Sequence, residues 1–426
     1  MNEKKIRIKS AINKFFEELS RKKTKHSKSK NQKEPDISFR VRSGNLSIPG
    51  ETRTPTAEQM ITSHGYRSES HTVITADGYM ITMHRVLPSY EVIRPRVVIL
   101  HHGLFGSSDD WLLLGEQKAL PYVLTDNGYD VWLLNARGNK YSKMHTRTGP
   151  VMMDFWDFSW HEIGVYDLPA TITYISEITR QAELNFIGHS MGATALLVLL
   201  STLPEYNYVL RSGILLSPLV FMYHAKGPLR MLANFYRTNG HSSLNFLGQT
   251  EFMYSEFPEQ IIEKYCKGNR KTSCQNPLLL LGNGGQECTD PVLMSRILAH
   301  VPAGGSVKTL MHYVQLAKSG YFQKFDYEAS NNLKIYKNVT PPLYNFRSMT
   351  LPMAMFSSPS DWLATVADIQ TLLPLLQEVS IHHVVKAENF GHFDFVWSPD
   401  APELVFHFIL SILDNTIPKR DAYAET

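Results

Sequence analysis

Residues 184–197, LNFIGHSMGATALL, hold a serine between two glycines where two apolar segments meet. The first segment is strand-like, and the small and apolar residues after it are typical of a buried helix. Gly188 and Gly192 allow a turn so tight that side chains at these positions would collide. A Gly-x-Ser-x-Gly motif between a strand and a helix is a nucleophile elbow, so Ser190 is predicted to be a nucleophile.

A serine hydroxyl is a weak nucleophile at neutral pH, and it needs a base that a carboxylate orients. Where the nucleophile stands on such an elbow, the acid and then the histidine follow on loops after late strands. Asp361 comes directly after the apolar segment 351–358, and His392 lies in the loop after the segment 379–387. The expected catalytic group is therefore Ser190 as nucleophile, Asp361 as acid and His392 as base.

Four nearby residues compete for these roles. Asp368 falls within the helix expected after Asp361, and Asp394 is two residues beyond the histidine, where stabilisation of the local loop is the better interpretation. His382 and His383 lie inside a predicted strand, where core or face positions are expected.

Negative charge on a tetrahedral intermediate needs two N–H donors. The residue after the nucleophile, Met191, is expected to supply one, and Leu104 in the loop 101–111 the other. Because both donors are backbone groups, the side chains at these positions matter little.

Alternating strands and helices predict an α/β fold, with a mostly parallel sheet flanked by helices. A hairpin is expected over 66–87, and residues 219–345 interrupt the alternation as an insertion. The predicted strands after the hairpin are 96–103, 129–138, 184–190, 213–218, 351–358 and 379–387, and helices are predicted over 116–127, 160–178, 191–203, 365–378 and 401–414.

The charge balance differs between the start of the protein and the rest. Residues 1–34 hold 12 Lys and Arg against 4 Asp and Glu, whereas the remainder holds 31 against 36. The mildly acidic body gives no reason to expect a nucleic-acid partner. Apolar residues at helical spacing among the lysines of 1–34 predict either a basic amphipathic helix that touches a membrane or lipid-droplet surface, or a solvated extension.

Several segments together resemble the acid lipase family, the gastric and lysosomal lipases of animals with their insect relatives. They are HHGLFGSS, NARGNKYSKMH, DFWDFSWHEIGVYDLPATITYI, GHSMGAT and NFGHFDFVW, in this order within residues 55–415. The resemblance implies an α/β-hydrolase core with an inserted cap or lid, no metal and no cofactor, and hydrolysis of triacylglycerols or sterol esters at a lipid interface. It assigns the triad to Ser190, Asp361 and His392.

The resemblance also implies a disulfide, for which Cys266 and Cys274 are the candidates, whereas Cys288 matches less cleanly. The sequence contains no CxxC pair, which argues against a zinc site. Asn45 and Asn338 begin Asn-x-Ser/Thr sequons and are candidate glycosylation sites.

Two features depart from the family. The family commonly has Gln after the nucleophile, where this sequence has Met191, and this affects the expected substrate preference. The family enters the secretory pathway, but the first residues contain no apolar run of the kind that a signal peptide has. An extracellular or lysosomal location is expected from the resemblance, and an intracellular one stays open.

The expected organisation has four parts: a basic N-terminal extension over 1–48, the first part of the hydrolase core over 49–218, the cap over 219–345 and the second part of the core over 346–426. The expected activity is cleavage of carboxylic esters of neutral lipids through an acyl-enzyme. The alternatives are a catalytically inactive lipid carrier on the same scaffold, and an esterase or thioesterase for smaller acyl groups.

Overall fold

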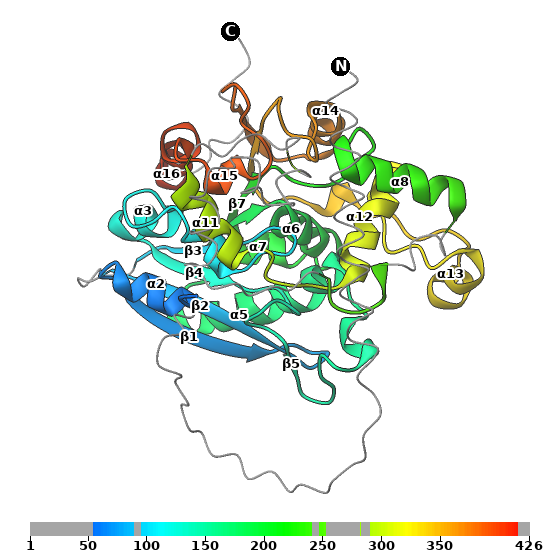
Figure 1. The fold of residues 1–426 in the computed structure, drawn as a ribbon, viewed down its shortest axis with the longest axis horizontal. Helices are drawn as coiled ribbons and strands as arrows, with labels where there is room; N and C mark the ends of the chain where they lie inside the picture. The colour runs from blue at the N-terminus through cyan, green and yellow to red at the C-terminus, as the bar shows by residue number, and fades with distance from the viewer. Residues whose placement is uncertain (1–53, 89–94, 241–246, 253–281, 283–289, 416–426) are drawn as a thin grey trace, which may run out of the picture. The chain divides into compact units, whose positions relative to one another are not determined.

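A nine-stranded sheet forms the centre of the computed structural model, which describes residues 54–88, 95–240, 247–252, 282 and 290–415 (Figure 1). The strand order is β1-β2-β4-β3-β6-β7-β8-β9, and β5 pairs with β2. The strands are β1 (Arg67–Ile74), β2 (Tyr79–Leu87), β3 (Val97–His101), β4 (Asp130–Leu134), β5 (Met144–His145), β6 (Leu184–His189), β7 (Leu210–Leu216), β8 (Met353–Ser357) and β9 (Val379–Val384).

The sheet is mixed, because an antiparallel hairpin joins a parallel series. Strands β1, β2 and β5 pair in antiparallel fashion, and the six strands β4, β3, β6, β7, β8 and β9 run parallel to one another. All residues of β3, β4, β6 and β8 are buried, whereas β1 alternates between more and less exposed residues. The burial on both faces agrees with the predicted parallel sheet between two layers of helices.

Helices of the core connect the strands. They are α2 (Ala57–Ser63), α3 (Leu120–Asp126), α4 (Trp160–Glu162), α5 (Leu168–Thr179), α6 (Met191–Thr202), α7 (Tyr206–Val209), α14 (Val366–Leu372), α15 (Asp394–Trp397) and α16 (His407–Asn415). Helix α6 is buried from Met191 to Leu200, in agreement with its apolar sequence. Two predicted helices are shorter than expected: α3 begins late, with Pro121 in its first turn, and α14 gives way to a 3-10 turn that contains Pro374.

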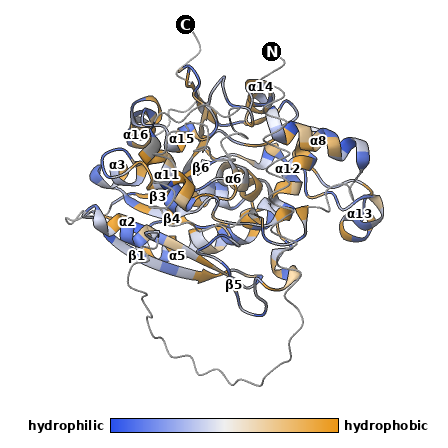
Figure 2. Cartoon of the chain, viewed as in Figure 1, coloured by the Kyte–Doolittle hydropathy of each residue, from blue (hydrophilic) through white to orange (hydrophobic). Residues whose placement is uncertain are grey.

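The described part of the insertion between β7 and β8 is helical. It contains α8 (Gly227–Asn239), α11 (Pro291–His300), α12 (Val307–Ser319) and α13 (Ala329–Tyr336), and α8 packs against α12 (Figure 1). Helix α8 carries both hydrophilic and hydrophobic residues (Figure 2), and it buries Leu229, Ala233 and Tyr236 at helical spacing. No helix among the described residues is long and apolar enough to cross a membrane.

Candidate active site

Ser190 stands at a strained bend between β6 and α6. Its backbone has φ 54° and ψ −111°, a conformation that a non-glycine residue adopts only where its surroundings enforce it. A Cβ atom on Gly188 would lie 2.5 Å from the backbone nitrogen of Ala193, and one on Gly192 would collide with the backbone of His101. Both glycines are therefore required for β6, the bend and α6 to pack this closely.

The structure brings the three residues of the expected triad together. The Ser190 hydroxyl lies 2.8 Å from Nε2 of His392. The Nδ1 atom of His392 lies 3.0 Å from Oδ2 and 3.2 Å from Oδ1 of Asp361. All three side chains are buried. Each residue follows the carboxyl end of a parallel strand (β6, β8 or β9), and these ends meet at one edge of the sheet.

Asp361 is held as a carboxylate. Its Oδ1 atom accepts hydrogen bonds from the N–H groups of Leu363 at 2.8 Å and Ala364 at 2.9 Å. Burial by itself would raise the pKa of Asp361, but the charge of His392 and the hydrogen bonds to the carboxylate outweigh burial and hold this pKa below its ordinary value. An ionised Asp361 can accept a hydrogen bond from the Nδ1–H of His392, which leaves Nε2 free to accept from the serine.

His189 supports the loop of His392 from the strand that carries the nucleophile. Burial lowers the pKa of His189 to about 3, so its imidazole is neutral. Its Nε2 atom lies 2.8 Å from the backbone oxygen of His392, to which a neutral ring donates a hydrogen bond.

The candidate N–H donors belong to two segments next to Ser190. Met191 is the first residue of α6, and the N–H groups of a first helical turn have no partner within the helix. Leu104 follows Gly103, and a Cβ atom on Gly103 would lie 3.3 Å from the Cβ of Ser190. The loop with Leu104 therefore runs directly beside the serine.

The competing acids have other partners. Asp368 accepts from Thr365, the N-cap of α14, and lies 2.9 Å from Nδ1 of His224. Asp394 accepts a hydrogen bond from the N–H of Gly391 at 2.5 Å and begins α15. Both carboxylates stabilise local structure.

The competing histidines lie in β9, as their sequence predicts. The Nε2 atom of His382 lies 2.8 Å from the hydroxyl of Ser357, and that of His383 lies 3.2 Å from the carbonyl of Leu404.

The structure adds a residue that sequence reasoning missed. The hydroxyl of Ser217 donates to Oδ2 of Asp361 and lies 2.7 Å from Nδ1 of His392. No local pattern in the sequence singles out this residue, which is next to last in the predicted strand 213–218.

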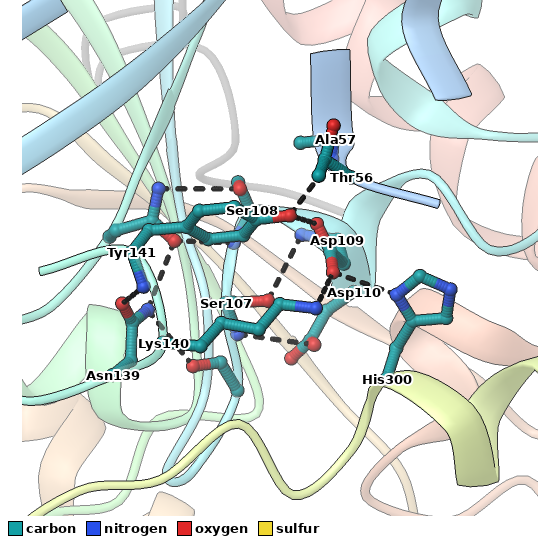
Figure 3. A network of polar contacts seen from close by, with 12 residues as sticks. Thr56, Ala57, Ser107, Ser108, Asp109, Asp110, Asn139, Lys140, Tyr141 and His300 are labelled. Atoms are coloured by element: carbon teal, nitrogen blue, oxygen red, sulfur yellow. Dashed lines mark hydrogen bonds and ion pairs between the residues drawn. The ribbon is translucent and has the colours of Figure 1, made fainter. Parts of the chain in front are cut away.

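A second unforeseen feature is a buried ionic network around Asp109, in the same loop as Leu104 (Figure 3). Asp109 forms an ion pair with Lys140, lies 2.7 Å from Nδ1 of His300 and accepts from the hydroxyl of Tyr141 at 2.8 Å. Burial would raise the pKa of Asp109, but the bond with His300 and the charge of Lys140 lower it to about 2. The network ties this loop to α11 of the insertion and to the loop after β4.

Several predicted sites lie outside the described residues. Cys266, Cys274, Cys288 and Asn45 are among them, whereas Asn338 is described and exposed.

The fold and this site define an α/β-hydrolase. The model of the "alpha/beta hydrolase fold" family matches residues 96–399, and that of the "partial alpha/beta-hydrolase lipase region" matches residues 57–115. The protein is 36% identical over 364 residues to Lipase 3 of Drosophila melanogaster, covering 84% of this sequence and 92% of that protein. It is 35% identical over 364 residues to the gastric triacylglycerol lipase of Bos taurus, covering 83% and 90%. With the gastric triacylglycerol lipase of Homo sapiens the identity is 32% over 370 residues, covering 85% and 92%.

The chain therefore belongs to the acid lipase family, and it is a lipase-type carboxylic ester hydrolase.

Proposed function

We propose that the protein hydrolyses esters of neutral lipids through an acyl-enzyme formed on Ser190. The serine oxygen attacks the ester carbonyl, while Nε2 of His392 takes the hydroxyl proton and then protonates the departing alcohol. Asp361 holds the imidazole in the required tautomer. A water molecule, deprotonated by His392, releases the fatty acid and restores the serine. The 2.8 Å approach of the Ser190 hydroxyl to Nε2 is the single observation that carries this proposal.

The N–H groups of Met191 and Leu104 are the proposed donors to the oxyanion. Met191 follows the serine directly and the loop with Leu104 runs beside it, which supports this role. Each such donor typically lowers the barrier by roughly 2.7–4 kcal/mol. The strained backbone of Ser190 and the adjacent glycines keep these donors in place before the substrate arrives.

Triacylglycerols or sterol esters are the proposed substrates, and residues 219–345 are the proposed cap. Two of the relatives are triacylglycerol lipases by name, which supports this class. A cap suits such substrates because a water-insoluble ester reacts in a site from which water is excluded.

The proposed contact with a lipid surface uses exposed apolar side chains at the edge of the sheet that carries the triad. Met80 pairs with Ile74 on one side and Met144 on the other, and the two outer side chains are 55% and 63% exposed. Residues 151–153 add Val and two Met, all exposed. Because Met83 pairs with Leu134, the last residue of β4, this row extends past the carboxyl ends of the parallel strands.

A location outside the cell or in the lysosome is proposed with this activity. The relatives named gastric lipases and the exposed sequon at Asn338 support it.

The decisive experiment replaces Ser190 with Ala. We expect the variant to lose hydrolysis of fatty-acyl p-nitrophenyl esters and of emulsified triacylglycerol, and to keep the far-UV circular dichroism of the wild type. Undiminished hydrolysis by the pure variant would refute the assignment. A fluorophosphonate probe should label the wild type and fail to label the variant.

A further inference from the structure

Ser217 lies beside the nucleophile elbow, at the end of the strand next to β6. It follows β7, is fully buried, and has a left-handed backbone with φ 52°. Its N–H donates to the carbonyl of Phe356 at 2.9 Å, and the carbonyl of the preceding Leu216 accepts the N–H of Ser190 at 2.9 Å. The end of β7 is thereby joined to β8, which precedes the acid, and to the elbow.

The Ser217 hydroxyl makes two contacts with the triad, and their chemistry assigns the hydrogens. A carboxylate only accepts, so the single hydroxyl hydrogen points to Oδ2 of Asp361. The oxygen of the hydroxyl is then an acceptor for the Nδ1–H of His392, 2.7 Å away. Because Nδ1 carries the hydrogen, Nε2 presents its lone pair to Ser190.

We infer that Ser217 is a positioning residue of the catalytic centre, whose hydroxyl holds the carboxylate of Asp361 and the imidazole of His392 in the orientation that aims Nε2 at Ser190. The inference rests on the proposed roles of these three residues. If Asp361 were the only acceptor for the Nδ1–H of His392, the imidazole could tilt about that hydrogen bond. With Ser217 added, the Nδ1–H lies between two acceptors that are themselves hydrogen-bonded, so the ring has less freedom. The same hydroxyl also bonds to the histidine when it becomes positively charged during the reaction.

The test compares Ser217→Ala and Ser217→Gly with the wild type, using a soluble p-nitrophenyl ester and fluorophosphonate titration to count active sites. We expect kcat per titrated site to fall about tenfold in both variants with little change in KM, because a lost hydrogen bond to a charged group costs at least this much. Glycine adopts a φ near 52° without strain and alanine does not. A loss of kcat confined to Ser217→Ala would therefore indicate backbone strain and would overturn the inference.

A second comparison separates positioning from general stabilisation. In the Asp361→Asn background, Ser217→Ala should change kcat by less than about twofold, since the hydroxyl acts through the carboxylate and the imidazole. An equal loss in both backgrounds would overturn the inference.

Ser212→Ala is the matched control. Ser212 is a buried serine of β7, the strand that precedes Ser217; its hydroxyl donates to Asn185 at 2.9 Å, and its replacement should leave kcat unchanged. A loss in the control as large as that in Ser217→Ala would also overturn the inference. Ser190→Ala, compared with the wild type per mole of protein on the same ester, reports on the proposed function independently, because only its residual activity would show that the serine is not the nucleophile.

Discussion

Gly188 offers a sharp test of how the bend controls catalysis. A Cβ atom added there would lie 2.5 Å from the backbone nitrogen of Ala193 and 2.6 Å from the carbonyl carbon of Gly192, whereas ordinary contacts begin at 3.4 Å. The three nearest atoms it meets all belong to the backbone of α6, so rotation of a neighbouring side group would not relieve the overlap. The first turn of α6 must move by the difference between 2.5 and 3.4 Å, about 0.9 Å.

This displacement should affect activity more than stability. A shift of about 1 Å at a reacting group costs on the order of 100-fold in rate, and the moving turn begins with Met191, next to Ser190. Overpacking of a buried backbone costs about 1–3 kcal/mol. For a protein of this size, that lowers Tm by roughly 1–4 °C. We therefore expect Gly188→Ala to fold and to lose most of its kcat.

The assay measures kcat on a p-nitrophenyl ester per fluorophosphonate-titrated site, together with Tm. Gly149→Ala is the matched control, because a Cβ atom on Gly149 meets nothing within 4 Å. The control should behave as the wild type. If Gly188→Ala kept kcat within about threefold of the wild type, the reasoning from backbone contact would be wrong.

Three further predictions concern the acid, a buried carboxyl group and the apolar edge. Asp361→Asn should lower kcat about 10⁴-fold while Tm changes little, because an amide at this position favours the wrong imidazole tautomer; stopped-flow or steady-state kinetics will show whether it does. Burial, with a contribution from the charge of Asp109, raises the pKa of Asp110 to about 8. The folded state thus binds a proton that the unfolded state releases near pH 4, so the stability that this group contributes is present at low pH and is lost as the pH rises through 8. Asp110→Asn should show a smaller fall in Tm than the wild type between about pH 4 and pH 8. An unchanged fall would exclude Asp110 as the group responsible. Replacing residues 151–153 with serines should leave hydrolysis of a soluble ester intact and weaken hydrolysis of emulsified triacylglycerol several-fold, whereas Tyr208→Ser, a change at an exposed residue of α7, should alter neither rate.

Local sequence determined much of this protein. The glycines around Ser190, the apolar strand before it and the small residues after it specify the bend through backbone sterics alone. The alternation of apolar strands and helices likewise led to the parallel sheet, and the order of Asp361 and His392 after late strands brought both to the same edge as the serine. Each of these inferences depends on residues close in the sequence or on a general rule of α/β topology.

Other features were decided only by tertiary structure. Ser217 joins Asp361 and His392 because β7 lies between β6 and β8, and a single serine at a strand end has no local pattern that reveals its partners. Asp109 and His300 are 191 residues apart and are paired by the packing of the insertion against the core. Long-range contacts of this kind depend on which strands are neighbours and on where an insertion packs, and those are properties of the whole folded protein.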